Sequence, residues 1–93
     1  ELSLALDLLD TFLKTRAKEL DMSPAYLASR GDLYNLVKSR ADGKDAPSDL
    51  RILRGWRREL VGDDLLGLLA GKYRLSLDPA GMGVVIHQVE DAG

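Results

Sequence analysis

The residues best suited to chemistry in this chain are arginines and a tryptophan gathered in the segment DLRILRGWRREL, residues 49–60. The segment holds Arg51, Arg54, Arg57, Arg58 and the chain's single tryptophan, Trp56. A guanidinium donates paired hydrogen bonds to phosphate and stacks on flat rings, and an exposed indole stacks in the same way. These residue types together indicate contact with a polyanion that carries phosphates and flat bases, which is nucleic acid.

Two arrangements of this segment fit its spacing. On one continuous helix Arg51, Arg54 and Arg58 share a face, whereas a bend at Gly55 changes that grouping. Alternatively, the arginines pair with nearby acidic residues, namely Asp49, Glu59, Asp63 and Asp64. We predict that Trp56 is buried, because a chain with 5% aromatic residues rarely leaves its only indole in water.

Charge is distributed unevenly along the chain. The formal net charge is −2, but residues 30–74 carry ten basic and seven acidic side chains, while the segments on either side are acidic. A weakly acidic total argues against binding phosphate by overall charge alone. Within the basic middle, Arg30, Lys38 and Arg40 are further candidate nucleic-acid contacts.

Catalytic residue types are scarce. The chain has no cysteine, which excludes a disulfide framework, a thiolate zinc site and a thiol nucleophile. Its single histidine, His87, has no cluster of metal-binding residues at ligand spacing, so we interpret it as an ordinary strand or surface residue. Ser23, Ser29 and Ser48 each precede an expected helix, where capping explains them without a nucleophile.

The adjacent carboxylates Asp63 and Asp64 do not indicate a metal site. Neighbours on a helix point about 100° apart, so these two belong on a solvated helix surface. No glycine-rich phosphate loop precedes a helix. We expect no catalytic residue, metal or cofactor in this chain.

No apolar run reaches the roughly 18 residues of a membrane span, and the N-terminus lacks a signal-peptide pattern. We expect a cytoplasmic protein with no membrane contact. Because the first residue is Glu1 and not Met, we interpret the chain as a piece of a longer polypeptide.

The apolar pattern of the chain predicts the helices that position the candidate nucleic-acid contacts. Apolar steps of three and four predict a helix over 2–20, and Ser23 with Pro24 predicts a short helix over 24–28. Ser29 with Asp32 resembles a capping pair for a third helix that reaches about Arg40. Residues 41–47 read as a surface loop.

The second half of the chain continues the helical pattern to about residue 70 and then changes to a strand-like pattern. Ser48 and Asp49 predict a new helix start, Gly55 a break, and residues 56–70 a last helix that Gly71 ends. Gly62 and Gly67 inside that helix predict close packing against a neighbour. Apolar and polar side chains alternate over residues 73–77, turn-forming residues follow over 78–83, and residues 84–89 are rich in β-branched side chains. This pattern predicts a hairpin or a loose tail.

The predicted fold is all-α: a compact bundle of about five helices over residues 1–72, with residues 73–93 as a C-terminal tail. At 93 residues the chain supports one core.

Residues 3–71 resemble the HRDC domain, the helical module of RecQ-type helicases and ribonuclease D. The likeness is carried by the order and spacing of two segments, SPAYLASRGDLYNLV and LRGWRRELVGDDLLGLL. The likeness is greatest to the second, C-terminal copy in bacterial ribonuclease D. Helicase copies usually place a Gly-x-Gly hairpin near Gly55, whereas Trp56 and Arg57 follow it here. The tail from Tyr73 onward has no counterpart in the family pattern.

The resemblance implies a non-catalytic accessory domain that positions RNA or another single strand for a 3′-to-5′ exoribonuclease on the same polypeptide. It implies a divalent metal in that nuclease and contact with its catalytic domain. Two alternatives remain: a protein-interaction module that packs on the parent enzyme through residues 84–89, and the HRDC domain of a RecQ-type DNA helicase. The oligomeric state is left open.

Overall fold

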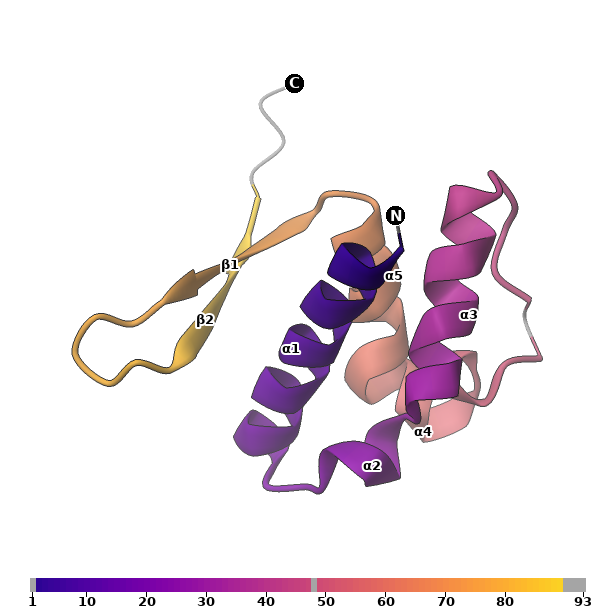
Figure 1. Ribbon diagram of the computed structural model, residues 1–93. Helices are drawn as coiled ribbons and strands as arrows, with labels where there is room; N and C mark the ends of the chain where they lie inside the picture. Colours follow the sequence, from indigo (N-terminus) through magenta and orange to yellow (C-terminus); the bar gives the residue numbers. More distant parts are fainter. Residues whose placement is uncertain (1, 48, 90–93) are drawn as a thin grey trace.

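The computed structural model describes residues 2–47 and 49–89 (Figure 1). Its longest element is α1, Ser3–Leu20, which buries the predicted apolar stripe against the other helices. The buried residues of α1 are Leu6, Leu9, Phe12, Leu13 and Ala17. The helix ends at Asp21, whose left-handed backbone (φ 55°) lets its amide donate to the carbonyls of Ala17 and Lys18.

Two further helices follow as the sequence predicts. They are α2, Pro24–Leu27, and α3, Arg30–Ala41. Ser29 forms a complete capping box, since its side chain accepts from the Asp32 amide while the Asp32 carboxylate accepts from the Ser29 amide. Ser23 stands at the N-cap of α2 without a side-chain capping bond, so the capping role predicted for it is wrong.

The helical stretch after the loop is more broken than the apolar pattern predicts. Ser48 lies outside the described residues, and in place of a restarted helix there is a single 3₁₀ turn, η1, Arg51–Leu53. The predicted helix over 56–70 consists of α4, Gly55–Arg57, then a wider π turn, η2, Arg58–Gly62, and then α5, Asp63–Leu69. Gly55 adopts φ 57°, a left-handed conformation that favours glycine, and it makes the predicted break.

The two glycines within this stretch mark close approaches, as predicted. A Cβ on Gly62 would lie 2.2 Å from the Ile52 carbonyl oxygen, and one on Gly67 would lie 2.7 Å from the Tyr73 ring. The absence of a side chain at Gly62 therefore lets η2 pack directly on the backbone of η1.

Residues 73–88 form a hairpin and not a loose tail. Strands β1, Tyr73–Leu77, and β2, Val84–Gln88, pair antiparallel from Tyr73↔Gln88 to Leu77↔Val84. An isolated hairpin is marginal in water, but this one packs Tyr73, Leu75 and Ile86 against the helical core. The protein is thus mostly helical with a docked two-stranded sheet.

Figure 1 shows α1 between the hairpin on one side and α3 and α5 on the other, with α2 and α4 together at one end of the bundle. The core lies between α1, α3, η1 and α5, each of which contributes an almost completely buried side chain: Leu9, Leu33, Ile52 and Leu65. Among residues 2–47 and 49–89, no helix has both the length and the apolar character needed to cross a bilayer.

Candidate nucleic-acid interface

The arginine segment does not form one helical face. Arg51 lies in the 3₁₀ turn and Arg54 has extended backbone (φ −129°, ψ 142°), while Arg57 and Arg58 follow the turn at Gly55. The four guanidinium groups therefore have different surroundings, and each is considered separately.

Arg51 is neutralised by a carboxylate from α3. Its Nη2 lies 2.9 Å from Oδ2 of Asp32, the same carboxylate that closes the capping box with Ser29. Burial raises the pKa of Asp32, but the hydrogen bonds from the Ser29 amide and from Arg51 outweigh it and hold the pKa below its ordinary value of 3.8. Arg51 thus connects η1 to the start of α3.

This arrangement predicts a pH-dependent contribution to stability. Since the pKa of Asp32 is lowered on folding, its stabilisation is complete well above pH 3.8 and disappears as the pH falls through the folded value. We expect Asp32→Asn to reduce the free energy of unfolding by about 1 kcal/mol at neutral pH. In urea unfolding at a series of pH values, the difference from wild type should shrink toward zero in acid.

Asp42→Asn provides the control for that series, because within residues 2–47 and 49–89 Asp42 pairs only with exposed Lys38 one turn away, at 3.1 Å. Its effect should stay below about 0.5 kcal/mol. An Asp32→Asn cost that does not change between neutral and acid solution would contradict the role given to the ionised carboxylate.

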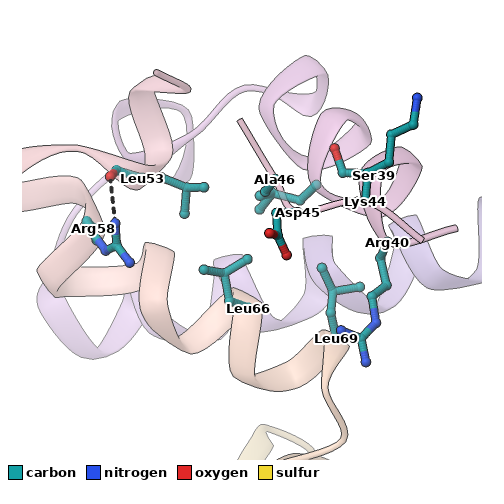
Figure 2. Close-up of a pocket in the computed structure, with 10 residues that line it drawn as sticks. Ser39, Arg40, Lys44, Asp45, Ala46, Leu53, Arg58, Leu66 and Leu69 are labelled. Carbon is teal, nitrogen blue, oxygen red and sulfur yellow. Dashed lines mark hydrogen bonds between the residues drawn. The ribbon is translucent and has the colours of Figure 1, made fainter. Parts of the chain in front are cut away.

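Arg58 is also paired. Its Nε donates to Asp63 Oδ1 at 2.8 Å, and its Nη1 donates to the Leu53 carbonyl at 3.5 Å (Figure 2). This is one of the carboxylate pairs that the alternative arrangement predicted. Asp64 instead accepts from Arg16 Nη2 at 2.7 Å and from the Tyr73 hydroxyl at 3.0 Å, which raises the pKa of Tyr73. The adjacent Asp63 and Asp64 therefore diverge toward different partners.

Arg54 is the least constrained arginine of the segment. It is exposed, and within residues 2–47 and 49–89 its guanidinium has no ion pair, hydrogen bond or ring contact. A charge without a carboxylate partner keeps its full attraction for an anion. Arg54 is therefore the residue of this segment most available to a phosphate.

The prediction that Trp56 is buried is wrong. Its side chain is 39% exposed and contacts Tyr26 of α2, with ring centroids 5.3 Å apart and planes inclined by 31°. The Arg57 guanidinium carbon lies 4.2 Å from the Trp56 ring centroid and 5.7 Å from that of Tyr26. The three flat groups form one exposed cluster, which we call the Tyr26–Trp56–Arg57 cluster.

A hydrogen bond from a side chain to the backbone joins the two helices of this cluster. Arg57 Nε donates to the Tyr26 carbonyl at 3.3 Å, which joins α4 to α2. The Arg57 side chain contacts a carbonyl and two rings but no carboxylate among the described residues, so its charge is not neutralised. Tyr26 was not predicted as a site residue, because its helix, PAYL, has only four residues, too few to define an exposed face by spacing.

The other candidate cations are divided between pairs and a groove. Arg30 lies 3.4 Å from Asp7, and Lys38 lies 3.1 Å from Asp42, both at exposed positions. Arg40 has no ion pair within the described ranges and lies at the rim of a groove between α3, the following loop and α5. Of these three, Arg40 is the most available for an anion.

That groove has a volume of about 320 Å³ and is lined by both polar and apolar side chains. Its lining comprises Leu36, Ser39, Arg40, Lys44, Asp45, Ala46, Leu53, Arg58, Leu66 and Leu69. Figure 2 shows the Asp45 carboxylate between Arg40 at one end and Arg58 at the other. Because a carboxylate stands among the cations, the groove is less suited to phosphate than the surface around Arg54.

His87 lies half-buried in β2, opposite Arg74 of β1. Its Nε2 is 2.6 Å from Ser76 Oγ, an interaction across the hairpin that the sequence did not predict. No carboxylate of the described residues contacts the ring, and no group of three metal-binding residues occurs in the same ranges. The pair ties the two strands together.

Three curated proteins with similar sequences are each named ribonuclease D. The protein from Gluconacetobacter diazotrophicus is 35% identical over 71 residues, which is 76% of this chain and 16% of that protein. The protein from Granulibacter bethesdensis is 34% identical over the same shares, and that from Zymomonas mobilis is 23% identical over 90% of this chain and 20% of its own length.

The chain therefore spans less than a quarter of the length of these relatives. No protein-family model matches it, and no solved structure does so. The predicted likeness to ribonuclease D is confirmed, while the finer assignment to the HRDC type stays a prediction.

Proposed function

We propose that this chain is an HRDC-type accessory domain of a ribonuclease D-like 3′-to-5′ exoribonuclease and that it holds single-stranded RNA for the catalytic domain on the same polypeptide. The observation that carries the proposal is a pair of guanidinium groups, that of exposed Arg54 and that of half-buried Arg57, without a carboxylate partner among the described residues. The similarity to proteins named ribonuclease D supports it and disfavours the helicase alternative.

In this function the domain supplies affinity and not chemistry. Arg54 contacts phosphate directly, and Arg57 contributes charge from the aromatic cluster. Arg51 and Arg58 belong to the scaffold, because Asp32 and Asp63 occupy their guanidinium groups. The divalent metal and the acidic residues of such a nuclease would lie in the catalytic domain.

The test is a titration of the 93-residue chain against a fluorescein-labelled oligouridylate, followed by anisotropy at several salt concentrations. We expect weak binding that Arg54→Glu reduces by about fivefold to tenfold at low salt, since one phosphate contact is lost and one repulsion gained. The slope of log affinity against log salt should fall by about 0.7 for each lost contact.

Arg74→Glu is the matched control, since Arg74 is an exposed arginine on the hairpin and its reversal changes the net charge equally. The control should alter affinity by less than about twofold. If Arg54→Glu and Arg74→Glu weaken binding equally, the contact is nonspecific; if no anisotropy change appears at high micromolar protein, the proposed function is wrong.

A second candidate function is docking on the catalytic domain of the parent chain. Its basis is an apolar surface where α1 meets the hairpin, with Leu4 74%, Leu8 46% and Leu77 59% exposed. A hollow of about 350 Å³ lies there, lined by Leu8, Thr11, Leu75, Ser76, Leu77 and Val84. A titration without RNA binding would favour this function, because exposed apolar surface then has no other partner.

A further inference from the structure

We infer that the Tyr26–Trp56–Arg57 cluster is a stacking site for one unpaired nucleobase, through which the domain selects single-stranded over duplex nucleic acid. The inference rests on the proposed function and adds to it the residues that recognise an unpaired base in the strand. The evidence for it is the Tyr26–Trp56–Arg57 cluster, and it does not depend on the unpaired charge of Arg54.

The first step is that both aromatic rings reach water. Trp56 is 39% exposed and Tyr26 is 58% exposed, although the chain has only five aromatic residues and its core takes Phe12 alone as a fully buried ring. An indole is usually placed where its large apolar surface is covered. Two adjacent rings at one end of the bundle therefore keep part of their surface open to a ligand.

The second step is that the groups of the cluster already contact one another. Trp56 stands on α4 and Tyr26 on α2, the rings contact each other at 5.3 Å, and the hydrogen bond from Arg57 to the Tyr26 carbonyl fixes one helix against the other. Rings that are already ordered lose little conformational freedom on binding. A base can thus stack without first assembling its site.

The third step is the match in chemistry. A nucleotide combines a flat π system with a phosphate, and the cluster combines flat rings with the Arg57 cation, while Arg54 stands two residues before Trp56. A base within a duplex is already stacked on its neighbours and does not present its face. The site therefore accepts only an unpaired base, and it tolerates any of the four because each has a π face.

The single tryptophan makes this directly measurable. The 93-residue chain is titrated with a short oligouridylate, with the same strand paired to its complement, and with a strand of equal length whose sugars carry no base. We expect the fluorescence emission of Trp56 to change when the single strand binds. The affinity for the duplex and for the abasic strand should be weaker by at least about fivefold, which is the smallest effect expected for the loss of one stacked base.

Variants separate stacking from support of the fold. Trp56→Phe keeps an aromatic face and should retain most of the preference for the based strand, whereas Trp56→Ala should bind the based and abasic strands equally. Thermal unfolding monitored by circular dichroism shows whether each variant is folded, and Tyr26→Leu provides a second variant if Trp56→Ala is not. Tyr26→Leu should also lose the preference for the based strand.

The outcomes distinguish this inference from the function on which it rests. Equal affinity for based and abasic strands, with binding still dependent on Arg54, overturns the stacking site and leaves the proposed function intact. Unchanged Trp56 emission on saturation with the single strand overturns it in the same way. Absence of binding to every strand overturns both.

Discussion

Gly62→Ala should destabilise the protein by about 3 kcal/mol or more, because the added methyl group would meet backbone and not a movable side chain. Its Cβ would lie 2.2 Å from the Ile52 carbonyl oxygen and 3.2 Å from the Ile52 carbonyl carbon. Relief requires η1 and η2 to move apart, and both elements contribute buried residues, Ile52 and Val61, to the core. The free energy of unfolding, measured with urea, gives the effect.

Gly31→Ala is the matched control for this measurement. Gly31 lies in α3, where an added Cβ would be 3.6 Å from Ser29 Oγ, an ordinary contact distance. Alanine should therefore leave stability unchanged or raise it by up to about 1 kcal/mol through helix propensity. Equal effects of Gly62→Ala and Gly31→Ala would show that η2 does not approach η1 as closely as the structure has it.

The same close approach bears on the candidate interface. Gly62 lets the π turn pack on η1, and η1 leads directly into Arg54 and the aromatic cluster. A Gly62→Ala variant that still folds should therefore also bind RNA less well than wild type, because the base of the arginine segment is displaced. The interface thus depends on a glycine that cannot itself contact a ligand.

Local patterns predicted the local structure of the first half of the chain well, whereas the continuous helix expected over 56–70 is interrupted by η2. The three-residue spacing of Ser29 and Asp32 predicted a capping box because both partners lie in one helical turn, and the periodic leucines of residues 2–20 predicted α1. Glycine positions predicted the break at Gly55 and the close packing at Gly62. Each of these features is decided within a few residues or by the absence of a side chain.

Contacts between distant segments were not predictable in the same way. The partner of Arg51 is Asp32, 19 residues earlier, so no spacing within the arginine segment could show that this cation is neutralised. The partner of Trp56 is Tyr26, on a helix separated from it by α3 and a loop. The argument for burial of Trp56 used composition alone, whereas α4 has only three residues, too few to define a buried face by periodicity.

Phe12→Ala should cost about 3–5 kcal/mol, the range for deleting a buried aromatic ring. Phe12 is 0% exposed at the middle of α1, its ring lies 5.8 Å from that of Tyr73, and the Arg16 guanidinium carbon lies 5.5 Å from its centroid. Domains of this size are stable by about 5–15 kcal/mol. The substitution therefore removes a large share of the folding free energy, which urea unfolding followed by far-ultraviolet circular dichroism measures.

Phe12→Ala should also loosen the hairpin more than the rest of the fold, because Tyr73 is the residue through which β1 begins its packing on α1. Amide hydrogen exchange would show this as faster exchange across the Tyr73↔Gln88 to Leu77↔Val84 ladder than in α3. Leu4→Ala in the same helix is the control, since Leu4 is 74% exposed and should change stability by less than about 0.5 kcal/mol. Uniform acceleration of exchange in the hairpin and in α3 would instead mean that the two-stranded sheet and the helices unfold as one cooperative unit, and that Tyr73 does not form a separable contact.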